Sequence, residues 1–365
     1  MSAASPSAPA LEGSILILML YDACEEIRLT ELNKILGARR VAQTFKHAAP
    51  EYVKFERPPV VEQLEPAQFD GGLILNRQIK YYDYGVVSVI FEIPFSGNWN
   101  DLIRLSAKWM AGTDFEREAE RLARTQIERA KAALIRPYPT WLSEDYFIFN
   151  LRNIGGNPTA SDLLQKHGSD IARVVRGETA ELADSERAEV LQSSLSYYPT
   201  DLSVIGWNAA FVFDTPSGAE TSIQLLEYAN SQLLEFRHYD DLLTRELASV
   251  YDFLKHSGVV LKRWRLGNEA YKLQSVTVEV TELVERADNA IKFLSDMFSA
   301  RLYRLAAAKV GVHDYKNLVN QKLHTAEDLY RYLIEGFQQS RAFLLELMVV
   351  IILVIELVFL FHPHA

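Results

Sequence analysis

The chain has 365 residues and a formal net charge of −10, with 48% hydrophobic and 11% aromatic residues. The length allows about two domains, and the apolar and aromatic content predicts packed globular structure. The acidic balance argues against a nucleic-acid partner, and the single cysteine, Cys24, excludes an internal disulfide and a cysteine-based zinc site.

The first segment, residues 1–13, is rich in Ser, Ala and Pro and is expected to be disordered. It contains no Lys or Arg, so neither a signal peptide nor a mitochondrial presequence is indicated. The apolar run over residues 15–20, ILILML, predicts a buried strand.

Residues 14–217 alternate between strand-like and helix-like patterns, which predicts an α+β head domain with a sheet on one side and helices on the other. Predicted strands follow at residues 52–55, 73–82, 84–93, 146–151, 202–205 and 209–213. Predicted helices cover residues 25–36, 100–110, 114–135, 159–175 and 185–193.

Residues 218–340 have a different pattern, in which apolar side chains recur every three or four positions along three stretches. This spacing predicts long antiparallel helices in a coiled-coil-like stalk. Asp240 is a polar residue within the first seam, so we expect it to fix the register or to pair with a basic residue of a neighbouring helix. His238 and Asp241 share a helix face; a solvated polar face and a metal site are both open, and we assign no metal ligands.

Two further clusters are candidate contacts. Lys262, Arg263, Trp264 and Arg265 form a basic-aromatic group that suits a lipid headgroup or single-stranded RNA. The alternative is an ordinary helix start with scattered charges.

The C-terminal stretch, residues 341–361, is apolar except for Arg341, Glu346 and Glu356. About 20 apolar residues would span about 30 Å as a helix, so we expect one transmembrane helix followed by a short tail over residues 362–365. Glu346 and Glu356 are then membrane-embedded polar residues that should face protein. The basic residue before the segment predicts that the bulk of the chain is cytoplasmic. A buried helix of a core is the alternative.

Three stretches resemble the "required for meiotic nuclear division" family of membrane proteins, which share a domain of unknown function. They are residues 19–36 (MLYDACEEIRLTELNKIL), 82–91 (YDYGVVSVIF) and 344–357 (LLELMVVIILVIEL). The middle of the chain departs from the family pattern. The resemblance implies a membrane-anchored, self-assembling protein and contributes no catalytic motif.

The sequence therefore predicts a non-enzymatic, tail-anchored protein that acts as a scaffold or self-assembling interaction protein at a membrane surface. We expect a homo-oligomer, no cofactor and no catalytic residues. Two alternatives stay open: an enzyme with a site in residues 155–214, and a ribosome- or RNA-tethering adaptor.

Overall fold

The computed structural model describes residues 11–37, 40–41, 53–55, 57–69, 72–112, 114–256, 259–289, 291–293 and 297–361. The expected disorder of residues 1–10 and the tail over 362–365 lie outside this range. Residues 11–13, which were also expected to be disordered, begin the first strand.

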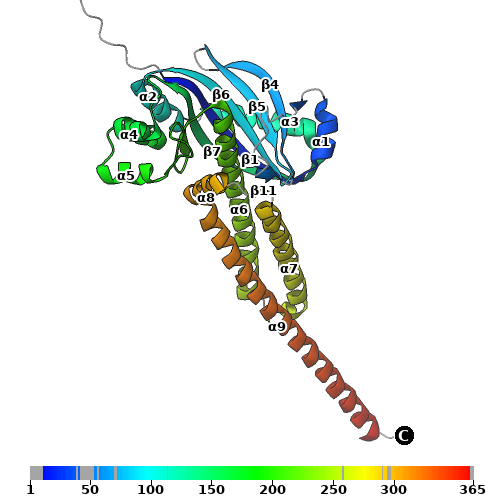
Figure 1. The fold of residues 1–365 in the computed structure, drawn as a ribbon. Helices are drawn as coiled ribbons and strands as arrows, with labels where there is room; N and C mark the ends of the chain where they lie inside the picture. The colour runs from blue at the N-terminus through cyan, green and yellow to red at the C-terminus, as the bar shows by residue number, and fades with distance from the viewer. Residues whose placement is uncertain are drawn as a thin grey trace, which may run out of the picture. The chain divides into compact units, whose positions relative to one another are not determined.

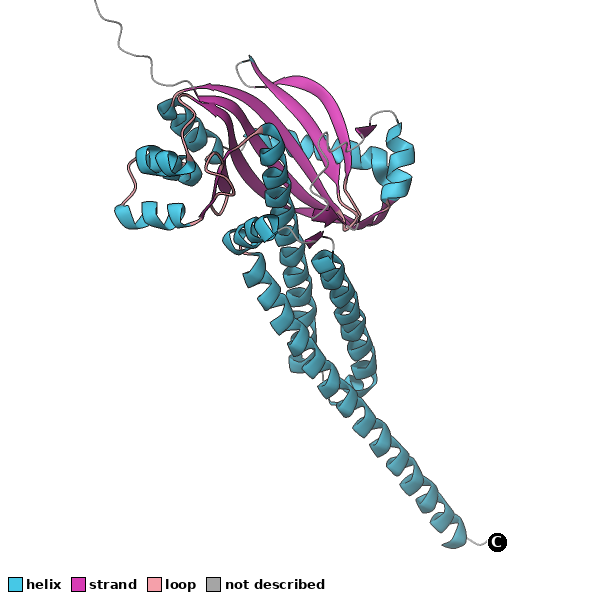
Figure 2. Ribbon diagram, viewed as in Figure 1, coloured by secondary structure: helices cyan, strands magenta, loops and turns pink. Residues whose placement is uncertain are grey.

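Nine of the described strands form one sheet, in the order β2-β4-β5-β6-β1-β7-β10-β9-β8 (Figures 1 and 2). β1 is antiparallel to both β6 and β7, β10 runs parallel to β7, and the other neighbours are antiparallel, so the sheet is mixed. A second sheet pairs β3 with β11. The strands are β1 (Leu11–Ile27), β2 (Arg40–Val41), β3 (Val53–Phe55), β4 (Val60–Phe69), β5 (Leu73–Tyr81), β6 (Val86–Gly97), β7 (Leu134–Ile154), β8 (Ser194–Leu195), β9 (Leu202–Ile205), β10 (Ala209–Phe213) and β11 (Ile291–Phe293).

Helices occupy the connections within the head and most of the chain after β10. They are α1 (Leu29–Leu36), α2 (Trp99–Met110), α3 (Asp114–Ala130), α4 (Ala160–Arg176), α5 (Asp184–Gln192), α6 (Pro216–His256), α7 (Val259–Asn289), α8 (Met297–Val310) and α9 (Val312–Phe361). A short 3-10 turn, η3 (Lys131–Ala133), joins α3 to β7. Capping boxes start α2 at Asn98 and α4 at Thr159, where each side chain accepts a backbone N–H of the first turn.

The central strand β1 is buried on both faces, because its side chains alternate between two packed layers. Ile15, Ile17 and Met19 face one layer and join a core formed with α2, α3 and α4. In that layer the Trp99 ring stacks on His167, with centroids 4.8 Å apart, and also contacts Phe211. The opposite face lies against the first half of α6 (Figure 1). The helices α2, α3 and α4 of the predicted head thus pack on one face of the sheet, and the other face is covered by α6, which the sequence had assigned to the stalk.

The chain divides into two compact units. The first contains Met1–His238 and Arg286–Tyr315, and the second contains Tyr239–Glu285 and Lys316–Ala365. In the second unit, apolar side chains of α6, α7 and α9 share one core; these are Leu247, Val250, Leu266, Ala270, Leu273, Ala326 and Leu333.

Most predicted head elements are present, with shifted bounds. The strands at 202–205 and 209–213 are confirmed as β9 and β10. β1 continues to Ile27, so the helix expected from residue 25 begins only at Leu29. The sequence did not indicate β4, whose polar and apolar residues alternate irregularly around Pro66.

The predicted membrane anchor is contradicted. Among the residues that the structure describes, no helix combines the length and the apolarity needed to cross a bilayer. The transmembrane helix at 341–361, the single-pass localisation and the role at a membrane surface are thus wrong as predicted.

Candidate functional site

The most polar part of the interior lies where α6 crosses the sheet. Glu227, Ser231, Glu235 and His238 follow one another at four, four and three positions, so they share one face of α6. The first three are at most 3% exposed. The sequence had suggested a solvated polar face here, and the structure places this face against the sheet.

Glu227 is paired with Lys80 of β5, and their side chains are 0% and 9% exposed. Burial and the Glu227 carboxylate together raise the pKa of the nearby Tyr82 well above its usual value. One helical turn further on, the hydroxyls of Ser231 and Tyr84 lie 2.7 Å apart in a hydrogen bond. A buried charge is tolerated only when it is paired and hydrogen-bonded, so these contacts set the position of α6 on the sheet.

His238 closes this row. Its Nδ1 lies 2.7 Å from an Asp22 carboxylate oxygen of β1, and Asp22 is almost fully buried. The Tyr138 ring stacks on the imidazole with centroids 4.5 Å apart. Burial raises the pKa of Asp22, and the hydrogen bond and charge of His238 act in the opposite direction. A carboxylate that fixes one ring nitrogen of a histidine orients the imidazole.

The neighbouring groups limit the chemistry of this cluster. Burial and the Asp22 carboxylate raise the pKa of the Cys24 thiol to about 12, and Sγ donates a hydrogen bond to the carbonyl oxygen of Glu26 at 3.3 Å. A nucleophilic cysteine needs a lowered pKa, so Cys24 is a buried packing residue. Within the described chain no group of His, Cys, Asp or Glu side chains is arranged to hold a metal ion.

Asp240, the predicted register residue, lies in the second unit. Its carboxylate is 2.6 Å from the ammonium of Lys322 on α9, and the same ammonium also donates to the Thr244 hydroxyl. The ion pair joins α6 to α9. Its role in fixing the register stays a prediction.

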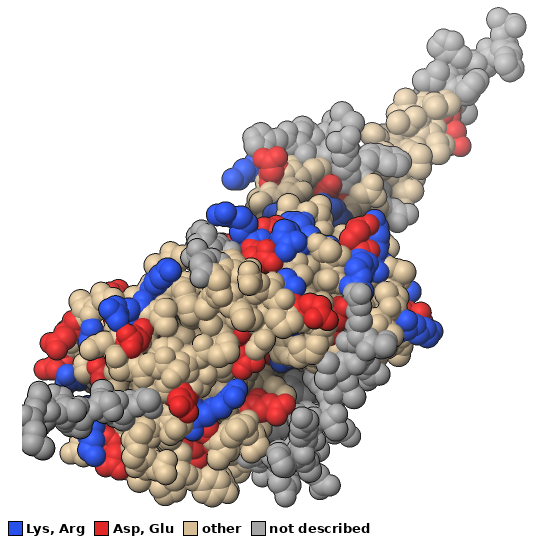
Figure 3. Space-filling view, turned by 90° about the horizontal axis from the view of Figure 1, so that it is seen from above, with Lys and Arg blue, Asp and Glu red and all other residues tan. Residues whose placement is uncertain are grey.

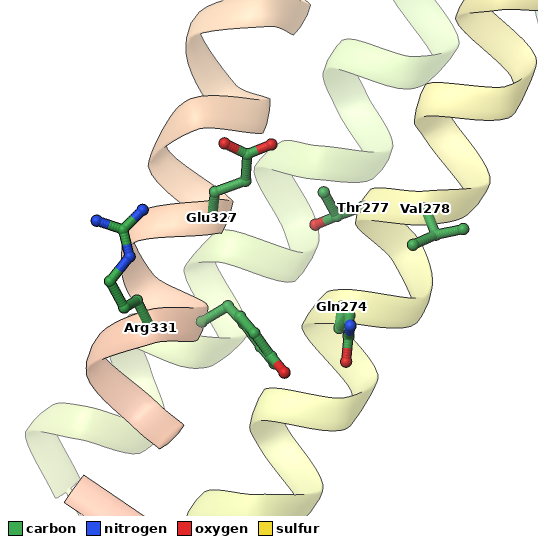
Figure 4. A pocket seen from close by; sticks show the side chains of 6 residues that line it. Gln274, Thr277, Val278, Glu327 and Arg331 are labelled. Atoms are coloured by element: carbon green, nitrogen blue, oxygen red, sulfur yellow. The ribbon is translucent and has the colours of Figure 1, made fainter. Parts of the chain in front are cut away.

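A hollow of about 380 Å³ lies between α7 and α9 in the second unit (Figure 4). Gln274, Thr277 and Val278 line it from α7, and Glu327, Tyr330 and Arg331 line it from α9. Its lining carries one charge of each sign, and Val278 is 60% exposed. This is an open, mixed surface without the convergent polar groups of a ligand site.

The remaining predicted residues are distributed along two helices. Lys262, Arg263, Trp264 and Arg265 belong to α7, but their side chains lie outside the described residues. Glu346 and Glu356 lie on the exposed end of α9. Among the described side chains, Glu346 and Glu356 take no part in the polar cluster on α6, and the partners of that cluster on the sheet, Lys80, Tyr84 and Asp22, were not indicated by the sequence. The regular four-residue spacing of polar side chains along α6 could have indicated a polar face packed against the sheet. The apolar seam on the same helix favoured the interpretation as a stalk helix instead.

Comparisons with known proteins add one family. A family model described as "Uncharacterized protein MJ0711, N-terminal domain" matches residues 12–220. The uncharacterized protein MJ0711 of Methanocaldococcus jannaschii is 18% identical over 195 residues, which cover 53% of this chain and 60% of that relative. The chain therefore matches about three fifths of the relative's length. No solved structure matches the chain. The resemblance to the "required for meiotic nuclear division" family stays a prediction.

Proposed function

We propose that copies of this chain associate in solution through the C-terminal part of α9. The chain belongs to the uncharacterised MJ0711 N-terminal domain family, and the family model ends before most of α6 and all of α9. The proposal therefore concerns the part of the chain that lies beyond the family model. The protein is then a self-assembling interaction protein. The observation that supports this proposal is the exposure of residues 342–357, which we call the apolar end of α9.

Every described side chain in the apolar end is exposed. Leu344 is 38% exposed and Leu345 59%, and the other large side chains lie between these values. Only Glu346 and Glu356 are charged. A continuous apolar surface of this kind on a single chain is a sign of an interaction site, since burying it removes apolar area from water.

The sequence pattern favours a second copy as the partner. Leu344, Leu347, Ile351 and Val354 continue the three-and-four spacing of Ala326 and Leu333, which are already packed in the helical core of the second unit. The same seam therefore serves packing within one chain and, further along, packing between chains. Apolar residues also occupy the other sides of the helix, so a single partner helix would leave much of the surface in water. We therefore expect at least three copies.

Mass measurement of the full chain tests this proposal. Native mass spectrometry or light scattering should give a discrete multiple of the 41.5 kDa chain at about three or more copies. Leu347→Lys with Ile351→Lys should reduce the mass to that of one chain, because both residues are exposed and their replacement spares the core. Tyr332→Lys, on an exposed site of α9 outside the apolar end, is the matched control and should leave the mass unchanged. A monomeric wild-type chain would refute the proposal.

The enzyme with a site in residues 155–214 and the ribosome- or RNA-tethering adaptor stay predictions.

A further inference from the structure

A rigid loop on the first unit exposes two tyrosine rings. Tyr197 and Tyr198 are 62% and 63% exposed. Their backbone N–H groups both donate to the carboxylate of Asp201, at 2.8 Å and 2.6 Å, and the carbonyl oxygen of Pro199 accepts from Ala160 at 2.7 Å. The two rings pack edge to face, 4.6 Å apart. Because the loop is already held in place, binding through these rings loses little conformational entropy.

The rings adjoin the exposed face of α8. Tyr197 contacts Phe298 edge to face, with centroids 5.2 Å apart, and the preceding residue, Met297, is 69% exposed. Arg301 and Arg304 are exposed as well. They follow Met297 by four and seven positions and so share its side of the helix. Aromatic rings and guanidinium groups therefore form one continuous surface.

The two arginines differ from most basic residues of the head. Charged side chains of both signs are interspersed over the molecular face in Figure 3, and exposed arginines such as Arg121 and Arg124 are paired with Glu118 and Glu120. Among the described residues, no carboxylate lies within ion-pair distance of Arg301 or Arg304. Their charge is thus available for a ligand.

We propose that this surface, formed by Tyr197, Tyr198, Met297, Phe298, Arg301 and Arg304 and called here the Tyr–Arg surface, docks an acidic peptide segment of a partner protein. The proposal is independent of assembly through α9. Apolar or aromatic side chains of the peptide pack on the ring faces, and its carboxylates are bound by the two guanidinium groups, whose planar forks suit carboxylate geometry.

The charges around this surface favour an acidic peptide over a nucleic acid as the partner. Affinity for a phosphate backbone grows with the number of cations that contact it, and the surface offers two. The next basic residue on α8, Lys309, is paired with Glu189 at 2.5 Å, so a carboxylate stands where a continuous polyanion would extend. The chain as a whole is also acidic, at −10. A peptide with a few carboxylates between apolar side chains fits this arrangement better.

Fluorescence anisotropy with the full chain tests the proposal. The probes are a labelled random copolymer of Glu and Tyr, a charge-reversed copolymer of Lys and Tyr, and single-stranded oligothymidylate. We expect binding of the Glu–Tyr copolymer only. Arg301→Glu with Arg304→Glu, and separately Tyr198→Ala, should each weaken it by about tenfold or more.

Two matched controls address nonspecific effects. Trp207→Ala removes an aromatic ring that is 64% exposed elsewhere on the head, and Arg152→Glu reverses an exposed arginine on β7. Both should bind the Glu–Tyr copolymer like the wild type. Circular dichroism checks that each variant is folded. Absence of Glu–Tyr binding, unchanged binding by the arginine variant, or tighter binding of oligothymidylate would overturn the proposal.

Discussion

The ion pair between Lys80 and Glu227 should be among the most sensitive contacts of the first unit. Both side chains are almost fully buried, so Lys80→Met leaves a carboxylate inside the protein without its counter-charge. Removing one partner of a buried pair costs about 3–5 kcal/mol of unfolding free energy. We expect a loss in that range, because Glu227 cannot reach water while α6 stays on the sheet.

The double variant separates the cost of an unpaired charge from the worth of the pair. Replacing both partners by apolar residues of similar size is often neutral or stabilising, so Lys80→Met with Glu227→Leu should recover most of the loss. Tyr82 then loses the carboxylate beside it, and a buried hydroxyl left without a partner costs about 1–3 kcal/mol. The double variant should therefore be more stable than Lys80→Met and somewhat less stable than the wild type.

Urea unfolding followed by tryptophan fluorescence measures these differences. A Trp264→Phe background removes the tryptophan of α7 and leaves those of the head, namely Trp99, Trp109, Trp141 and Trp207. The control is Lys34→Met, whose exposed pair with Glu31 should contribute about 0–1 kcal/mol. The reasoning fails if the unfolding free energy of Lys80→Met lies within about 1 kcal/mol of that of its parent. It also fails if the double variant is less stable than Lys80→Met.

Three further predictions concern pH, reactivity and backbone space. Burial raises the pKa of Asp22, so the folded chain keeps the carboxyl proton to higher pH than the unfolded chain. The contribution of Asp22 to the unfolding free energy should therefore decline as pH rises from about 4. Asp22→Asn should remove this decline when unfolding is measured as a function of pH. Asp162 gives the opposite sign, since hydrogen bonds from Thr159 lower its pKa and its contribution is lost as pH falls below about 4. Cys24, with a pKa of about 12, should react with a thiol reagent at neutral pH only after denaturation, and fast labelling of the folded chain would contradict the packing role. Gly85 has φ of 99°, and an added Cβ would lie 1.7 Å from the carbonyl oxygen of Cys24. Gly85→Ala should therefore destabilise the head by more than about 1 kcal/mol in the same urea assay. A stability equal to that of the wild type would mean that this turn can move.

Local patterns determined much of the secondary structure. The run ILILML could be recognised as a buried strand because β-branched and leucine residues in a short apolar segment suit a sheet that is covered on both faces. The spacing in the C-terminal third similarly indicated helices, since a three-and-four repeat places apolar side chains on one side of a helix. The continuity of α9 from Val312 to Phe361 follows from the same repeat.

Local patterns gave the wrong prediction for α6, in which the apolar face and the polar face are both packed against other parts of the chain. The first half of α6 carries an apolar stripe and a polar stripe, and by itself this is the pattern of a helix with one side in water. The sheet supplies Lys80, Tyr84 and Asp22 from three separate segments, and these partners make burial of the polar stripe favourable. No spacing along α6 could reveal them.

For the C-terminal segment too, composition predicts a need for burial but does not predict what the segment packs against. Its composition determined that residues 342–357 need an apolar environment, because leaving such side chains in water costs free energy in proportion to their area. Composition cannot identify that environment, and the expected bilayer anchor was wrong. Tertiary structure decided which polar groups are buried in the head, since the free energy of a charge depends on the groups that surround it rather than on its neighbours in the chain.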